Sequence, residues 1–114
     1  MTEVVLFRDT EHNIVGYVAE GHSGYGEHGE DIVCAAISVL TQTALLSLNR
    51  VCEIREKDIE FELEDGYIRA MLSGDIEAEA REKANIVLGS MTVGLESVAE
   101  QYPDFITLKY REVD

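Results

Sequence analysis

The chain has 114 residues, of which 46% are hydrophobic and 28% charged, and this composition is typical of a globular domain. Its length suits one compact domain over residues 1–114. The sequence contains 23 acidic residues and 9 basic ones, so the formal net charge is −14. This balance argues against direct binding of nucleic acid, because neutralising phosphates requires clusters of Lys and Arg. The negative charge would suit a basic partner, and it would also serve solubility alone.

The first residues do not resemble a secretory signal. Thr2 and Glu3 precede a short apolar run, whereas a signal has a basic segment followed by a longer apolar one. We therefore expect a cytoplasmic protein. In that compartment the two cysteines, Cys34 and Cys52, are expected to be reduced thiols and not a disulfide.

Apolar periodicity predicts the elements of the first half of the chain. Val4–Phe7 and Ile14–Glu20 are predicted strands joined by a polar hairpin loop. Four glycines in residues 21–30 predict an irregular loop. Asp31–Arg50 is predicted to be a helix with no charge between its ends and apolar residues on every side. We expect a sheet to cover one side of this helix and another helix or a second subunit to cover the other, because its polar residues argue against a membrane span.

The second half of the chain has a similar order of elements. Residues 59–72 alternate between apolar and polar on both sides of Asp65-Gly66, which is a strong hairpin signal and leaves one acidic face. Glu77–Tyr102 has apolar residues three and four apart and is predicted to be an amphipathic helix before Pro103. Phe105–Arg111 is the last predicted strand. The order ββαββαβ predicts an α+β fold with a mainly antiparallel sheet and two helices.

The residues best suited to catalysis are His22 and Cys34. His22 follows a predicted strand, and Cys34 falls in the first turn of the predicted helix. Unpaired N–H groups and the helix dipole there would favour a nucleophilic thiolate and could form an oxyanion hole. A neighbouring imidazole would pair with the thiolate and later protonate a leaving amine. The alternative is that Cys34 belongs to the core, because unbridged cysteines are among the most buried residues.

Other residues give weaker signals. His28 is a rival base in the glycine loop, and Cys52 is expected to be structural. A metal site made of His22, His28 and Cys34 is the rival chemistry, but the sequence lacks the closely spaced ligand pairs of zinc sites. We expect neither a metal nor another cofactor.

Residues 21–38 read Gly-His-Ser-Gly-Tyr-Gly-Glu-His-Gly-Glu-Asp-Ile-Val-Cys-Ala-Ala-Ile-Ser. This run resembles the signature of the ribosomal-processing cysteine protease family called Prp. The shared features are a Gly-His pair, a gap of eleven residues, and then Cys followed by Ala-Ala-x-Ser. The length and the order of elements agree as well, so the resemblance covers essentially the whole chain. The residue after the histidine is often Ala in the family and is Ser23 here.

The resemblance implies a cysteine endopeptidase domain with His22 as its catalytic histidine and Cys34 as its nucleophile. Family members are homodimers that remove the N-terminal extension of a bacterial large-subunit ribosomal protein, number twenty-seven of its series. Cleavage follows a short apolar stretch that contains a pair of Phe residues. The alternative function is a ribosome-associated protein that binds a basic peptide and cuts nothing.

Asp31 and Ser38 match the other polar positions of the family motif. Asp31 precedes Cys34 by three residues and Ser38 follows it by four, so all three would share one helical face. Asp31 either orients His22 or caps the helix. Ser38 either forms a hydrogen bond near the sulfur or bonds back to the carbonyl of Cys34.

The glycine loop also suggests a moving part. Four glycines leave few packing anchors, so residues 23–30 are expected to act as a lid over the substrate. Gly21 and Gly24 are the predicted hinges of this lid.

Overall fold

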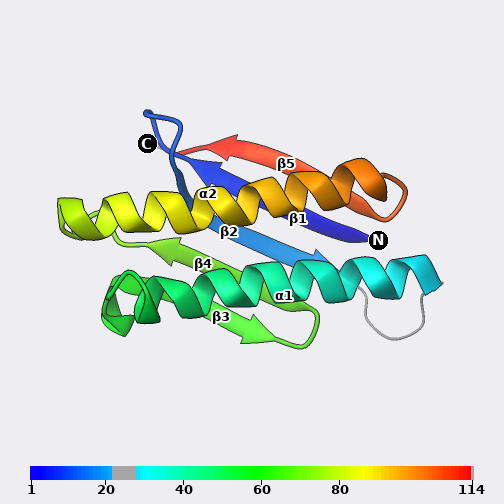
Figure 1. Ribbon diagram of the computed structural model, residues 1–114, viewed down its shortest axis with the longest axis horizontal. Helices are drawn as coiled ribbons and strands as arrows, with labels where there is room; N and C mark the ends of the chain where they lie inside the picture. The colour runs from blue at the N-terminus through cyan, green and yellow to red at the C-terminus, as the bar shows by residue number, and fades with distance from the viewer. Residues whose placement is uncertain (22–27, 114) are drawn as a thin grey trace.

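The computed structural model describes residues 1–21 and 28–113, and residues 28–30 by their backbone alone. Two helices pack side by side on one face of a five-stranded sheet (Figure 1). The elements are β1 (Thr2–Arg8), β2 (Ile14–Gly21), α1 (His28–Arg50), a short 3₁₀ helix (Glu56–Asp58), β3 (Ile59–Glu64), β4 (Tyr67–Leu72), α2 (Ala78–Gln101) and β5 (Ile106–Glu112). The predicted α+β fold with the order ββαββαβ is confirmed.

The strands lie in the order β3-β4-β2-β1-β5. Three of the four pairings are antiparallel, and β5 runs parallel to β1, so the prediction of a mainly antiparallel sheet is confirmed. β1 begins two residues earlier than predicted. Thr2 is therefore inside the sheet, between Gly21 on β2 and Ile106 on β5.

The β3–β4 turn is tied to the end of β2. Gly66 has a φ of 75°, in the left-handed region that favours glycine. The N–H of Gly21 donates a hydrogen bond to the carbonyl of Gly66 at 3.0 Å. A Cβ atom on Gly66 would lie 2.7 Å from the carbonyl oxygen of Gly21, so these two backbones approach closely. The hairpin tip is thereby held beside the strand that leads into residue 22.

The hydrophobic core lies between the helices and the inner face of the sheet. Tyr17 of β2 is fully buried, and its hydroxyl donates a hydrogen bond to the carbonyl of Thr41 on α1 at 2.7 Å. Burial raises the pKa of the Tyr17 phenol, so it remains a neutral donor. The helices contribute the buried apolar residues Val33, Ile37, Ala44 and Leu48 from α1 and Ala84, Leu88, Met91 and Leu95 from α2.

The two helices run antiparallel and approach closely (Figure 1). A Cβ atom on Gly94 of α2 would lie 2.7 Å from Cδ2 of Leu40 on α1, so a larger residue there would have to displace the end of the Leu40 side chain. By length and composition, Asp31–Arg50 would also suit a membrane span. The core helices of globular domains pass the same test, and the inner stripe of α1 is packed against the sheet and α2.

We expected a sheet on one side of α1 and a helix or a second subunit on the other, and the sheet and α2 both pack against it. They cover only part of its surface. Val39 and Leu46 of α1 are 65% and 52% exposed, and Ile86 and Val93 of α2 are 70% and 66% exposed. The spacing of seven residues within each pair places its members on one side of their helix. We call these four side chains the outer helical face.

Candidate active site

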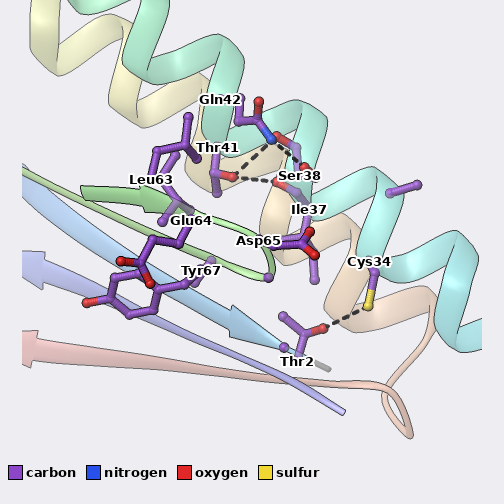
Figure 2. Close-up of a pocket in the computed structure, with 15 residues that line it drawn as sticks. Thr2, Cys34, Ile37, Ser38, Thr41, Gln42, Leu63, Glu64, Asp65 and Tyr67 are labelled. Carbon is purple, nitrogen blue, oxygen red and sulfur yellow. Dashed lines mark hydrogen bonds between the residues drawn. The ribbon is translucent and has the colours of Figure 1, made fainter. Parts of the chain in front are cut away.

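A cavity of about 300 Å³ lies between α1 and the β3–β4 hairpin, at the end of β2 (Figure 2). One side of it is formed by α1, and the other by the hairpin tip and the ends of β1 and β2. The lining residues are Thr2, Ala19 and Gly21 from β1 and β2, Cys34, Ala35, Ile37, Ser38, Thr41 and Gln42 from α1, and residues 63–68 of the hairpin.

Cys34 is accessible from this cavity. It is half-buried on α1 and lines the cavity wall. Cys52 is only 2% exposed and lies in the hydrophobic core. Cys34 is therefore not a core residue, whereas Cys52 is.

The prediction that Cys34 lies in the first turn of its helix is wrong. Helix α1 begins at His28 and not at Asp31, so the last three residues of the predicted glycine loop are helical. Cys34 thus lies in the second turn, roughly 9 Å along the axis from the first residue. Only the first four amides of a helix lack intrahelical partners, and the dipole effect declines within the first turn. Neither the predicted thiolate stabilisation nor the predicted oxyanion hole can come from the start of this helix.

The sulfur of Cys34 instead contacts a side chain of the sheet. Thr2 Oγ1 lies 3.3 Å from Cys34 Sγ, a hydrogen bond in which either atom could be the donor (Figure 2). Thr2 was not among the predicted site residues, although its place in the sequence pattern gives a signal. Thr2, Val4 and Leu6 alternate as residues on one face of a strand do, and all three are buried.

The structure excludes one predicted role of Asp31 and gives Ser38 a different hydrogen-bond partner. Ser38 lines the cavity, but its Oγ accepts a hydrogen bond from Gln42 Nε2 at 2.6 Å, and within the described residues it is not bonded to Cys34. Asp31 is exposed and lies three residues inside α1, so the prediction that it is the N-cap is wrong. Its other predicted role, orienting His22, stays a prediction because His22 lies outside the described residues.

Part of the predicted lid also lies outside the described residues, including the hinge Gly24. Residues 28–30 belong to α1, so the predicted lid extends too far at its C-terminal end. Gly21, the other predicted hinge, ends β2 within the hydrogen-bonded sheet. A Cβ atom on Gly21 would lie 2.5 Å from Thr2 Oγ1, so a bulkier residue there would displace Thr2 whether or not a lid exists.

The rival metal site of His22, His28 and Cys34, which the sequence disfavoured, is not tested, because His22 and the side chain of His28 lie outside the described residues. Among the described side chains of residues 1–21 and 31–113, no three from His, Cys, Asp or Glu form a group that could hold a metal ion.

A second cavity of about 540 Å³ adjoins the first at the hairpin tip. The two share Gly21 and residues 64–67. Five carboxylates line the second cavity: Glu3, Glu20, Glu62, Glu64 and Asp65. Glu3 and Glu20 are directly opposed on β1 and β2, and like charges in that position destabilise a sheet. This acidic cavity would favour positively charged groups close to Cys34.

Comparison with known proteins matches the chain to cysteine proteases. The family model described as cysteine protease Prp matches residues 1–107. A Bacillus subtilis protein named ribosomal processing cysteine protease Prp is 26% identical over 91% of this chain and 92% of its own length. The Staphylococcus aureus protein of the same name is 27% identical over 97% of this chain and 100% of its own length.

Solved structures share the fold. The Staphylococcus aureus protease Prp in complex with a substrate peptide has a TM-score of 0.82 and 23% identity, and the match covers 97% of this chain and 100% of that one. The same protease with a covalently linked product peptide has a TM-score of 0.77 and 25% identity over the same shares of the two chains. A Streptococcus mutans protein has a TM-score of 0.78 and 25% identity, and its match covers 99% of this chain and 96% of that one.

Proposed function

The chain belongs to the Prp family of cysteine proteases, and on this basis we propose that it is an endopeptidase with Cys34 as nucleophile and His22 as base. The observation that carries the proposal is the position of Cys34. Its half-buried thiol lines a cavity beside Gly21, the residue that directly precedes His22 in the chain. A buried cysteine such as Cys52 could not reach a peptide bond.

The proposed reaction proceeds through a thioester. His22 takes the proton from the Cys34 thiol, and the thiolate adds to the carbonyl carbon of the scissile bond. The C–N bond breaks as His22 returns the proton to the leaving amine. Water then adds to the thioester carbonyl with His22 as base, and the C–S bond breaks. The products are a new amino terminus, a new carboxyl terminus and the regenerated thiol, and water is the only co-reactant.

The proposed substrate is the N-terminally extended form of large-subunit ribosomal protein twenty-seven. The first cavity has apolar walls at Ile37, Leu63 and Ile68, which suit the apolar stretch that precedes the proposed cut. A ribosomal protein must neutralise RNA phosphates, so it is rich in Lys and Arg. The acidic second cavity, next to the first, suits such a chain.

The acidic cavity gives a prediction in which stability and activity move in opposite directions. Replacing Glu3 and Glu20 together by Gln removes two opposed like charges, so the free energy of unfolding should stay equal or rise. The KM for a peptide with basic residues should rise by about threefold to tenfold, because rim charges each contribute about 0.2–1 kcal/mol. Urea unfolding and peptide kinetics measure the two effects.

The matched control removes the same net charge elsewhere. Glu82 and Glu100 are exposed on α2 and do not line either cavity, so replacing both by Gln should leave KM unchanged. Equal effects of the two double variants would show that only net charge matters and that the cavity does not select the substrate.

Selective alkylation distinguishes the endopeptidase from a binding protein, which has no need of a reactive thiol. Iodoacetamide at neutral pH should label Cys34 much faster than Cys52, and cleavage should be lost in proportion to Cys34 labelling. Cys52 is 2% exposed, and burial raises the pKa of its thiol more than Lys83 lowers it. Peptide mapping by mass spectrometry measures both sites. Undiminished cleavage by fully labelled Cys34 protein would reject Cys34 as the nucleophile.

The proposal includes a homodimer that acts in the cytoplasm. The outer helical face leaves four large apolar side chains exposed, and a second copy of the chain would cover them. A reducing compartment would keep the nucleophilic thiol from oxidation.

A further inference from the structure

We propose that Thr2 is a positioning residue for Cys34: its hydroxyl holds the sulfur in place and donates a hydrogen bond to the thiolate form. This inference rests on the proposed role of Cys34 as nucleophile. The observation behind it is the 3.3 Å contact between Thr2 Oγ1 and Cys34 Sγ, which links the sheet to α1 inside the cavity (Figure 2).

Thr2 is held rigidly enough to position another group. Thr2 is 4% exposed, and its strand β1 lies between β2 and β5. Its N–H donates a hydrogen bond to the carbonyl of Phe105 at 3.0 Å. A β-branched side chain also has few χ1 rotamers available. The direction of the hydroxyl is therefore set by the backbone of β1.

Gly21 provides the space that the Thr2 side chain occupies. A Cβ atom at position 21 would lie 2.5 Å from Thr2 Oγ1 and 3.2 Å from both Cβ and Cγ2 of Thr2. These distances are too short for any side chain unless Thr2 moves. Gly21 is fixed in turn by its hydrogen bond to Gly66. The sheet thus presents the Thr2 hydroxyl to α1 from a supported position.

The chemistry of the contact depends on the protonation state of the sulfur. In the thiol form, either Thr2 Oγ1 or Cys34 Sγ could donate. In the thiolate form only the hydroxyl carries a proton, so Thr2 must donate. A hydrogen bond donated to the charged form of a group favours that form, and a donor that is already in place needs no reorganisation during the reaction. Thr2 would thus stabilise the Cys34 thiolate, which the start of α1 is too distant to do.

Two substitutions at position 2 test the inference. Thr2→Val keeps the shape but removes the hydroxyl, and Thr2→Ser keeps the hydroxyl. The first readout is the rate of Cys34 alkylation by iodoacetamide between about pH 5 and pH 9, the range in which protein thiols ionise. The second is kcat and KM on a peptide that carries the apolar stretch with the Phe pair. Urea unfolding checks that both variants fold.

The Thr2→Val protein should alkylate at higher pH than the wild type. Its kcat should fall about tenfold to a hundredfold with little change in KM, as expected for loss of one hydrogen bond to a charged group. Thr2→Ser should restore both to within about threefold. An alkylation profile of Thr2→Val that coincides with that of the wild type would overturn the inference. Alkylation does not require cleavage, so a shifted profile in a protein that cuts nothing would support the contact and reject the endopeptidase proposal instead.

Discussion

Replacing Cys34 by Ala is expected to abolish cleavage without disturbing the fold. Loss of the nucleophile lowers turnover in such enzymes on the order of a million-fold, which would take the rate below detection. Cys34 is half-buried, and its truncation leaves the Thr2 hydroxyl without its sulfur partner, so the free energy of unfolding should fall by only about 1 kcal/mol. Cys34→Ser should also be inactive, because an alcohol is far less ionised than a thiol at neutral pH.

Cys52→Ala is the matched control, and it should lose stability while keeping its activity. Cys52 is 2% exposed in the core, so its truncation leaves a small cavity and should cost about 1–2 kcal/mol of stability. Cleavage at a temperature where the variant is folded should remain near the wild-type rate. Initial rates on a peptide substrate and urea unfolding measure both proteins. Full activity in Cys34→Ala would reject the proposed mechanism.

A single charge on the outer helical face is expected to convert a dimer into a monomer. Val39 is 65% exposed near the contact between Leu40 and Gly94, so Val39→Asp changes a central position of this face without entering the core. In a dimer that covers this face, each subunit would bury an unpaired carboxylate, at a cost of about 3–5 kcal/mol. The two carboxylates together cost about 6–10 kcal/mol, so the dissociation constant of the dimer should rise by a factor on the order of 10,000 or more.

Light scattering across micromolar concentrations measures the change in mass. Thr10→Asp introduces the same charge in the exposed β1–β2 loop, and this control should remain dimeric. A wild-type protein that is monomeric at every micromolar concentration would contradict the dimer proposal. A dimer that persists in Val39→Asp would place the interface on another surface.

The local chemistry of the chain made most of the fold predictable. Alternation around Asp65-Gly66 identified the β3–β4 hairpin, and Gly66 indeed takes the positive φ that such a turn needs. The regular apolar spacing of the second helix predicted α2 to within one residue at each end. In β4 and α2 the buried positions are apolar ones, whereas Phe61 and Leu63 of β3 are 40% and 51% exposed.

The sequence was a poorer guide at the site, because contacts between distant segments decide its geometry. Thr2 and Cys34 are separated by 32 residues and meet only when the sheet and α1 pack together. The start of α1 was placed too late, since the glycines before Asp31 indicated a loop although the helix already begins at His28. The exposure of the outer helical face was not predicted, because no property of a single sequence states how much of a helix its own chain will cover.

Mass analysis of the ribosomal substrate tests the central claim most directly. The full-length extended protein twenty-seven is incubated with the wild-type enzyme and, in parallel, with Cys34→Ala. The wild type should yield two fragments whose masses sum to the substrate plus one water, with the cut following the Phe pair, and Cys34→Ala should leave the substrate intact. An intact substrate after incubation with the wild type, or the same fragments from Cys34→Ala, would contradict the proposed function.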